Sequence, residues 1–429
     1  MIKMNKSDKL IYFFTKDSKL DGRLVMGAIL LIYFLSIFCS SFFMDYSRYW
    51  QMLGVSAAEE PFIDLKAATT AIKCIDVKFN STEPNPCNPW FAYPRIWYLL
   101  SPIWVNIEYV AYLAVFLIGL YFLAVYFVIG KINVNTGYYY LLLLCSPPMM
   151  LAVERGQPDL IIFILCAVAI GLMKKKNFAY LSGGILMLAG FLKLYPLATI
   201  ISFFSENKKK SMLLIFALTI IAAAYVFFNR ADFTRLTNSL NEHYWSVSVG
   251  FMHGCLVFFT LLNTYPAFHN IFQHIPYPII AYSLVVAIAI GTFLASRKKV
   301  VVSLNTDHLF SFRVGASLYL GSFLLGSNYD YKFIIFIFTI PQMLAWLKHS
   351  PGVRRITLLN ILFILFTCWS VLLSHMMYWI IYTFIEESLN WLIFSYYIFM
   401  LLNTLPLWLK KMLGFHTAGI AETGSLQPQ

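Results

Sequence analysis

The chain has 429 residues, of which 60% are hydrophobic, 18% aromatic and only 12% charged. A soluble protein carries about twice this charged fraction, so the composition excludes an ordinary water-soluble domain and predicts a polytopic membrane protein. The formal charge of +12 does not indicate a nucleic-acid partner, because the basic residues are spread over short loops between apolar runs, where they set membrane orientation.

Apolar runs of bilayer length recur along the chain and are expected to form helices, since the alternating pattern of a membrane β-barrel is absent. The predicted runs are 24–43, 105–130, 136–152, 159–173, 212–228, 277–296, 309–327, 333–347, 356–374 and 389–409.

One further apolar stretch, 178–205, is interrupted by Lys193 and Pro196. Its flanks are the KKK tracts 174–176 and 208–210, which should both be cytoplasmic. We therefore expect two short limbs that enter the membrane and return, as a broken re-entrant pair; a single span is the alternative. Counting both limbs, the sequence predicts an all-α membrane protein of about 12 membrane helices.

The charge of the loops predicts the orientation. Most lysines and arginines lie in loops on the side of the N-terminus, and most acids lie on the other side. Both termini should therefore be cytoplasmic, as tails over 1–22 and 412–429, with one transmembrane domain over 23–411. Two long outer loops, 44–104 and 229–276, remain, and the first should contain short interfacial helices.

The first candidate for chemistry is Asp45, at the outer mouth of the first predicted span. A solvated acid at a helix end is the ordinary interpretation. However, a carboxylate gains nothing from the dipole at a helix C-terminus, and Tyr46, Tyr49 and Trp50 should bury it in part. Partial burial raises a carboxyl pKa and suits the group to proton abstraction. Asp45 is therefore the candidate general base, with Tyr46 and Arg48 as candidate sugar or acceptor ligands.

The turn ERGQPD, residues 154–159, carries more functional side chains than a hairpin needs. Glu154, Gln157 and Asp159 are candidate ligands for sugar hydroxyls. Arg155 is a candidate partner for a phosphate group.

Lys193 is costly to place inside an apolar segment unless it is paired or hydrated. Snorkelling to the interface is one interpretation, and binding of a phosphate is the other. Tyr195 follows it as a candidate sugar ligand. Tyr93 and Arg95 precede the second span, where they form either part of an aromatic belt or a turn beside a lipid substrate.

Two more outer motifs combine acids, tyrosines and cations. NEHYWSVS contains Glu242 and His243, and SNYDYK contains Asp330 and Lys332. Tyrosine rings beside an acid suit a sugar, and interfacial belt residues are the competing explanation. Glu242 and Asp330 are candidate sugar ligands, and His243 and Lys332 are candidate phosphate partners.

Metal and nucleotide chemistry have little support in the sequence. No HExxH, no clustered Cys/His spacing and no glycine-rich nucleotide loop is present, so no cofactor is expected and a membrane-borne donor should supply the energy. Cys74 and Cys87 share the first outer loop, and both a disulfide and two free thiols are open.

The order of these motifs resembles a known family. An acid follows the first span, a long loop ends in YP, a GQ turn follows the third span, and KLYP and DYK come later. Together they resemble the integral-membrane GT-C glycosyltransferases, most of all glycosyltransferase family 87 and its bacterial envelope relatives. The family commonly has YPP where this chain has Tyr93-Pro94-Arg95, and asparagine where Asp159 stands.

This resemblance implies a GT-C fold and a metal-free inverting transfer in which Asp45 occupies the position of the catalytic base. It implies a polyprenyl (undecaprenyl) phosphate donor of a hexose, and a glycan or glycolipid acceptor such as O-antigen. The implied location is the periplasmic face of the bacterial inner membrane.

Two other classes of function were weighed against a glycosyltransferase. A transporter or flippase of a lipid-linked glycan explains Lys193 and the broken helix, but it predicts polar groups along a path to the cytoplasm. An envelope glycan polymerase or ligase would typically hold pyrophosphate with basic residues in a large outer loop, whereas the outer side here is net acidic.

Overall fold

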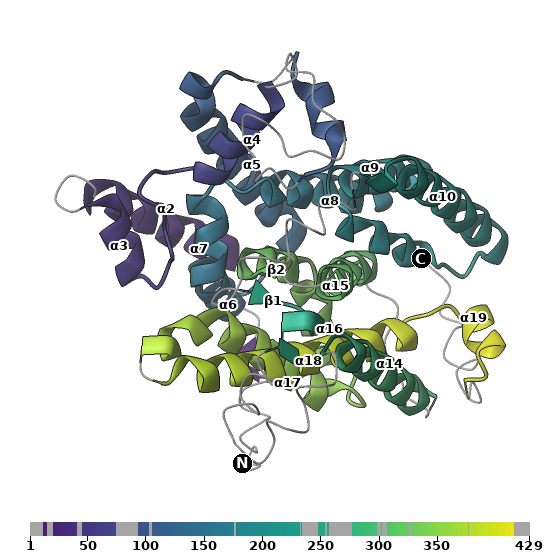
Figure 1. Ribbon diagram of the computed structural model, residues 1–429. Helices are drawn as coiled ribbons and strands as arrows, with labels where there is room; N and C mark the ends of the chain where they lie inside the picture. The colour runs from purple at the N-terminus through teal and green to yellow at the C-terminus, as the bar shows by residue number, and fades with distance from the viewer. Residues whose placement is uncertain are drawn as a thin grey trace, which may run out of the picture.

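The computed structural model is a bundle of helices with one short strand pair (Figure 1). It describes residues 12–14, 20–40, 45–73, 93–102, 105–175, 177–231, 233, 248–253, 255–256, 277–297, 302, 307–325, 328–375 and 377–415. The candidate residues Glu242 and His243, and the pair Cys74 and Cys87, lie outside these residues.

Four helices in the described part of the chain are long and apolar enough to cross a membrane, and two bent helix pairs raise this number to six. The four are Ile107–Ile129, Lys208–Phe228, Pro278–Ser296 and Arg354–Leu373. The first consists of η3 (Ile107–Tyr109) and α5 (Val110–Ile129), and the last consists of α17 (Arg354–Trp369) and part of η6 (Ser370–His375). The other two are α10 (Lys208–Phe228) and α14 (Tyr277–Ser296). The total of twelve membrane helices stays a prediction.

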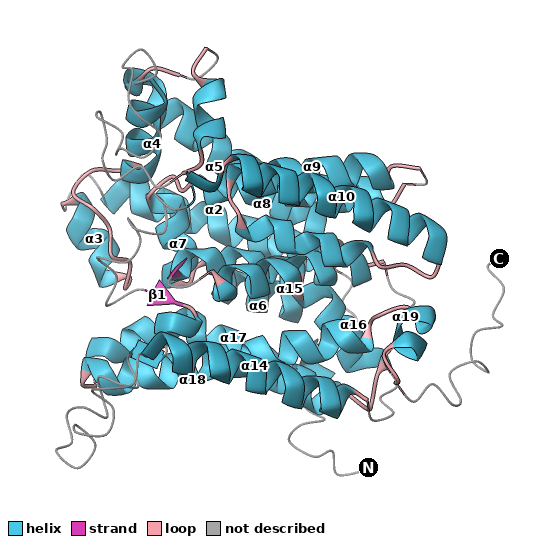
Figure 2. Ribbon diagram, turned by 45° about the vertical axis from the view of Figure 1, so that its right-hand side comes forward, coloured by secondary structure: helices cyan, strands magenta, loops and turns pink. Residues whose placement is uncertain are grey.

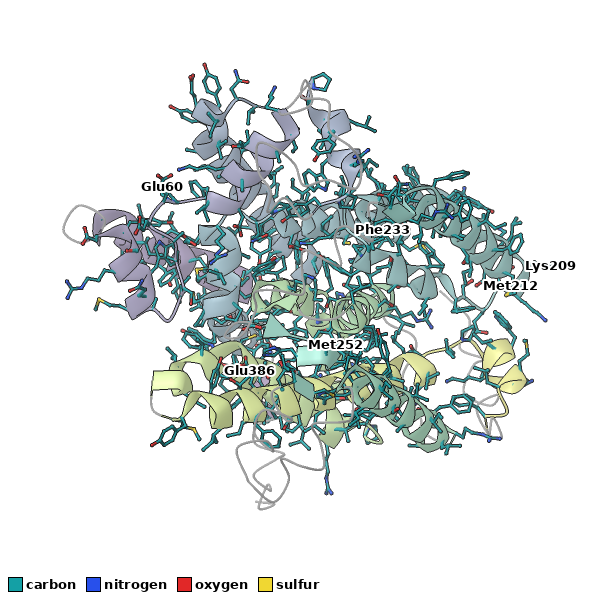
Figure 3. The ribbon with its side chains drawn as sticks, viewed as in Figure 1. Glu60, Lys209, Met212, Phe233, Met252 and Glu386 are labelled. Atoms are coloured by element: carbon teal, nitrogen blue, oxygen red, sulfur yellow. The ribbon has the colours of Figure 1, made fainter. Side chains whose placement is uncertain are left out.

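Shorter apolar helices complete the bundle and run alongside the long ones (Figure 2). They are α2 (Gly22–Ser40), α8 (Asp159–Met173), α9 (Ala179–Leu192) and α15 (Leu309–Leu324). The helices α3 (Tyr46–Met52) and α4 (Ile63–Lys73) lie at one end of the bundle and α19 (Leu407–Met412) lies at the other, so we name these the α4 end and the α19 end. Glu60 and Lys209 are labelled at these opposite ends in Figure 3.

The α4 end also contains η2 (Arg95–Leu100) and the strand pair. Strand β1 (Ser248–Val249) pairs antiparallel with β2 (Asn328–Tyr329). The pairing connects the second long loop to the segment that begins at Asp330.

Two of the predicted apolar runs are each divided into two helices. In the first run, α6 (Val134–Leu144) and α7 (Pro147–Glu154) meet at 61°. In the second, η5 (Asp330–Phe338) and α16 (Ile340–His349) meet at 49°. Pro147 and Pro341 lie in the first turn of the second helix of each pair. Proline lacks the N–H that would continue the previous helix, so each helix ends there and a new one begins.

The last predicted run, 389–409, has the wrong bounds. Helix α18 spans Trp379–Asn403, and α19 begins after Pro406. The predicted run starts too late because Glu386 and Glu387 interrupt the apolar pattern within α18. Both carboxylates are buried inside the protein, at 6% and 3% exposure, so they face neither lipid nor water.

The stretch 178–205 breaks at Lys193, where the backbone is extended between α9 and η4 (Tyr195–Phe203). Gly190 packs directly against the side chain of Leu197, so the chain folds back at the break. Lys174 before the stretch and Glu206 after it line one cavity of 620 Å³. The two ends of the stretch therefore lie close together, and the re-entrant pair in the membrane stays a prediction.

Arg313 holds the α19 end together. Its guanidinium donates to the carbonyl oxygens of Phe204 and Thr404, which follow η4 and α18. Carbonyl groups at helix C-termini have no partner within their own helix and carry partial negative charge. A partly buried cation at this position satisfies two of them at once.

The contact between α15 and η4 gives the first prediction. A Cβ atom on Gly321 would lie 2.5 Å from the carbonyl oxygen of Tyr195 and 2.9 Å from Cβ of Ala198. Gly321→Ala should therefore destabilise the protein by about 1–3 kcal/mol through overpacking. The measurement is the thermal unfolding midpoint in detergent.

The matched control is Gly171→Ala on α8, where an added Cβ meets nothing within 4 Å. This change should leave the midpoint unchanged or raise it, because alanine favours a helix over glycine by about 1 kcal/mol. Equal midpoints for the two variants would contradict the close packing of α15 on η4.

Candidate functional site

Polar side chains from α4, the α7–α8 turn, the α9–η4 break and η5 meet at the α4 end of the bundle. We call this group the polar row; its members are Asp64, Tyr93, Arg155, Gln157, Asp159, Lys193, Tyr195 and Lys332. Each contacts another member through a hydrogen bond, an ion pair or a ring.

Asp159 is the centre of the polar row. It is the first residue of α8, fully buried at 0% exposure, where the helix dipole favours an anion. Its Oδ2 accepts a hydrogen bond from Lys193 Nζ, and its Oδ1 accepts one from the Tyr195 hydroxyl at 2.7 Å. Lys332, only 6% exposed, also interacts electrostatically with this carboxylate. Two ammonium groups thus share one carboxylate.

Aromatic rings surround the two ammonium groups. Lys193 Nζ lies 5.1 Å from the ring centroid of Tyr93 and 5.8 Å from that of Tyr331. Lys332 Nζ lies 4.9 Å from the ring centroid of Tyr195. Ring faces attract cations, the more so where water is excluded. The rings therefore offset part of the cost of burying these charges.

Trp97 fixes the segment that carries Tyr93. Its indole N–H donates to the carbonyl oxygen of Leu192 at 2.9 Å, the last residue of α9. Tyr93 and Trp97 also make an edge contact, with ring centroids 5.5 Å apart. The loop before η2 is therefore attached to the helix end that presents Lys193.

The other half of the row centres on Asp64, which the sequence analysis missed. Asp64 Oδ2 accepts from Gln157 Nε2 and lies 3.7 Å from Arg155 Nη1. The Gln157 Oε1 atom in turn lies 3.5 Å from the Tyr93 hydroxyl. Burial raises the pKa of the Asp64 carboxyl above its ordinary range, while Arg155 acts in the opposite direction. An acid in the first turn of a helix is common, so no sequence signal marked it.

The structure corrects the expected environment of Asp45. Helix α2 is described as far as Ser40, and Asp45 precedes α3 as its N-cap residue. Its side chain is exposed, so the partial burial expected from Tyr46, Tyr49 and Trp50 is wrong. Three residues later, Arg48 is exposed too.

Tyr46 connects Asp45 to the polar row. Its hydroxyl donates to Glu154 Oε1 at 3.1 Å. Glu154, the last residue of α7, is 1% exposed and immediately precedes Arg155. Asp45 is therefore linked to the row through its chain neighbour Tyr46, the hydrogen bond from Tyr46 to Glu154, and the chain neighbour of Glu154, Arg155.

Asp330 interacts with an acid of α18 rather than with the row. Asp330 is buried, the acid of α18 is Glu386, and Glu386 accepts from the Ser370 hydroxyl at 2.8 Å. Successive residues of a 3₁₀ helix turn by about 120°, so Asp330 and Lys332 point to different sides of η5. Arg95 opens η2 and is partly buried.

Within the described ranges, no group of three histidine, cysteine, aspartate or glutamate side chains is arranged to hold a metal ion. The polar row instead offers cations, hydrogen-bond acceptors and ring faces. Such a set suits a ligand that combines an anionic group with hydroxyl groups.

Several apolar helices are long enough to cross a membrane, so the chain is a polytopic membrane protein. The polar row at one end groups acids, cations and hydroxyl groups, as the active sites of enzymes do. Residues 90–322, more than half of the chain, match the family model of glycosyltransferase family 87. The chain belongs to this family of GT-C-type membrane enzymes that use polyprenyl-phosphate sugars. Comparison with curated proteins and with solved structures gives no match.

The matched range contains the row members from Tyr93 to Tyr195. Asp45, Asp64 and Lys332 lie outside it. The family match therefore covers the centre of the site. Lys332, a candidate from the sequence, and Asp64, which only the structure identifies, complete it.

The shared carboxylate gives the second prediction. Asp159→Asn should destabilise the protein by about 3–5 kcal/mol, because removing one partner leaves buried charge uncompensated. The double variant Asp159→Asn, Lys193→Met should recover part of this loss. The thermal unfolding midpoint in detergent is the measurement.

The control is Asp307→Asn, which removes the same charge from an exposed position at the α19 end. Its midpoint should stay within about 0.5 kcal/mol of the parent. If Asp159→Asn is as mild as Asp307→Asn, the carboxylate does not compensate the lysines.

Proposed function

We propose that the protein transfers a hexose from a polyprenyl-phosphate donor, such as undecaprenyl phosphate-hexose, to a cell-envelope glycan or glycolipid. O-antigen is one such acceptor. The proposed site is the periplasmic face of the bacterial inner membrane, with both termini in the cytoplasm. The observation that carries the proposal is that two lysine side chains, the partly buried Lys193 and the buried Lys332, interact with one buried carboxylate, that of Asp159.

The excess positive charge supports a phosphate at this position. Phosphate oxygens bind ammonium groups through short charge-assisted hydrogen bonds. Lys193 and Lys332 would hold the donor phosphate, with Arg155 along the row as a further cation. His243 stays a predicted partner outside the described residues. Membership of family 87 supports a polyprenyl carrier for this phosphate and favours transfer over transport or polymerisation.

The sugar would lie against the hydroxyl, amide and ring groups of the row. Gln157 and Asp159 present acceptor atoms, and Tyr93 and Tyr195 present ring faces and hydroxyl groups. Sugars combine hydroxyl groups with apolar C–H faces, and this combination of side chains matches both.

In the proposed reaction, a base takes the proton of the acceptor hydroxyl as its oxygen bonds to the anomeric carbon. The bond from that carbon to the phosphate oxygen breaks on the opposite face, and its electron pair leaves with the phosphate. Lysine ammonium groups stabilise the charge that develops there. The transfer inverts the configuration and needs no metal.

Asp45 is the proposed base. Its side chain is exposed, so it is accessible to an acceptor that arrives at the membrane surface. Tyr46, which follows it, bonds Glu154 beside Arg155. A carboxylate is a common general base in proton transfer.

The base assignment gives the third prediction. Asp45→Asn should lower transfer by about 100-fold or more, the usual contribution of a general base, in a reconstituted assay with undecaprenyl phosphate-hexose. The unfolding midpoint should not change, because the side chain is exposed. Glu59→Gln, an exposed acid in the same loop, is the control and should keep full activity. Robust turnover by Asp45→Asn would reject this base.

The phosphate assignment gives the fourth prediction. Lys193→Met should raise the KM for the donor about 10- to 100-fold, because a hydrogen bond to a charged group contributes about 1.5–3 kcal/mol. The KM for the acceptor should stay nearly constant. Asp159 keeps Lys332 and Tyr195 as partners, so the variant should remain folded.

Lys66→Met is the control, because Lys66 pairs with Glu60 at the protein surface. Its donor KM should match that of the parent enzyme. If Lys193→Met leaves the donor KM unchanged while binding is otherwise intact, the phosphate lies elsewhere.

A further inference from the structure

A second cavity of 350 Å³ lies next to the polar row, between α2, α3, α5 and α7. Its volume is within the range of small-ligand sites, about 300–1,000 Å³. Its walls are aromatic and aliphatic, with one charged residue among those that line it. The lining residues that matter here are Phe34, Tyr46, Trp50, Val115, Ile118 and Glu154.

The cavity extends from the membrane surface into the hydrocarbon region. Tyr46 and Trp50 come from the short helix α3 at the α4 end. Ile118 is near the middle of α5, which is long and apolar enough to cross a membrane. Val115, on the same helix, lines the cavity and is 64% exposed. An exposed valine on a membrane helix faces lipid, so the cavity opens sideways into the bilayer.

Glu154 supplies a polar group at the inner wall. Its residue is 1% exposed, and its Oε1 already accepts from the Tyr46 hydroxyl. Its Oε2 is buried and has no hydrogen-bond partner among the described residues, although the backbone of Ala58 interacts with the carboxyl group. A buried acceptor without a partner is destabilising, because it has lost its hydrogen bonds to water. A ligand that donates one hydrogen bond would remove this cost.

Charge decides which kind of amphiphile suits the cavity. The single carboxyl group that lines it is that of Glu154, which offers no positive charge to a phosphate and repels one when it is ionised. Arg155, which follows Glu154 in the chain, is directed to Asp64 and to the Ser56 carbonyl instead. A phosphate-linked donor would favour the two lysines of the row. An uncharged, hydroxyl-bearing head would favour Glu154.

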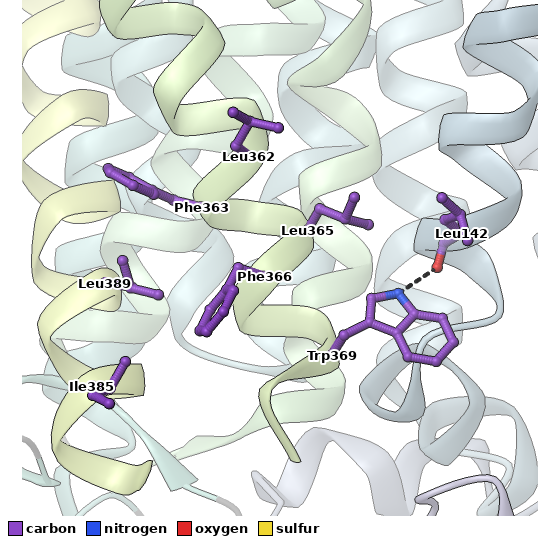
Figure 4. Close-up of a pocket in the computed structure, with 8 residues that line it drawn as sticks. All are labelled: Leu142, Leu362, Phe363, Leu365, Phe366, Trp369, Ile385 and Leu389. Atoms are coloured by element: carbon purple, nitrogen blue, oxygen red, sulfur yellow. Dashed lines mark hydrogen bonds between the residues drawn. The ribbon is translucent and has the colours of Figure 1, made fainter. Parts of the chain in front are cut away.

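A second apolar groove, which offers a ligand no free polar group, provides a comparison with the cavity at Glu154. It has a volume of 720 Å³ and lies on α17 and α18 (Figure 4). Its one polar side-chain group is the indole N–H of Trp369, which already donates to the Leu142 carbonyl at 3.0 Å. That groove offers contact to any hydrocarbon chain, whereas the cavity at Glu154 selects for a hydrogen-bond donor.

We propose that the cavity at Glu154 binds a lipid-anchored, uncharged glycolipid acceptor, with its chain along α2 and α5 and a sugar hydroxyl donating to Glu154 Oε2. This inference rests on the proposed function and deepens it, because it assigns the acceptor to the membrane rather than to the aqueous phase. Asp45, adjacent to Tyr46, would lie beside the bound head group.

The test uses the full-length protein in lipid nanodiscs and a decyl glucoside that carries a photoreactive diazirine in its chain. Cross-linked peptides are mapped by mass spectrometry. Label should appear on α3 and α5, and excess decyl glucoside should compete for it. Methyl glucoside, which lacks the chain, and decyl phosphate, which carries the wrong charge, should not compete.

Two bulky variants on one helix provide the matched comparison. Ile118→Trp fills the cavity and should lower the labelling at least tenfold. Leu123→Trp adds the same ring to α5 at a position that is 50% exposed and outside the cavity, and it should label like the parent. Glu154→Met, which removes both acceptor atoms, should also lower the labelling.

Equal labelling of Ile118→Trp and Leu123→Trp, or equal competition by decyl phosphate, overturns the inference. Binding of undecaprenyl phosphate is measured in the same nanodiscs. Loss of that binding in the parent protein would count against the proposed function alone, because the cavity contains no cation. Intact phosphate binding without labelling of α3 and α5 would count against the cavity alone.

Discussion

Two lysine ammonium groups, at Lys193 and Lys332, lie inside this membrane protein near a single carboxylate, that of Asp159. Removing each charge from water costs several kcal/mol, and only a close partner offsets this cost. One carboxylate compensates one ammonium. The N-terminus of α8 stabilises that carboxylate, and the tyrosine rings attract the ammonium groups. The arrangement leaves positive charge that an anionic substrate would neutralise.

Backbone breaks place these groups. A continuous helix through 178–205 would carry Lys193 on one face, exposed either to lipid or to packed side chains. The extended residue at Lys193 instead ends α9 inside the bundle, and the chain turns back through η4. Irregular backbone is tolerated at this depth because protein surrounds it. Gly190 and Gly321 allow the close approach of Leu197 and of the Tyr195 carbonyl, so small residues in neighbouring helices support the break.

Much of the site was predictable, because the sequence shows which charged side chains would be costly to bury without a partner. A lysine in an apolar run and four functional groups in the 154–159 turn are expensive unless they interact, and the structure brings them together. Nothing in the sequence marked Asp64 or Glu386 as costly to bury, because acids near helix ends or in loops are common. Only tertiary contacts bury them. The same limit explains the wrong expectation for Asp45, since its exposure depends on where α3 begins.

The central claim is that the donor phosphate binds between Lys193 and Lys332. The most direct measurement is an experimental structure of the protein with an undecaprenyl-phosphate sugar bound. The account predicts phosphate oxygens within about 4 Å of both lysine nitrogens, the usual limit for an ion pair. A phosphate bound away from both lysines, for example near Glu154 or Glu386, would contradict it.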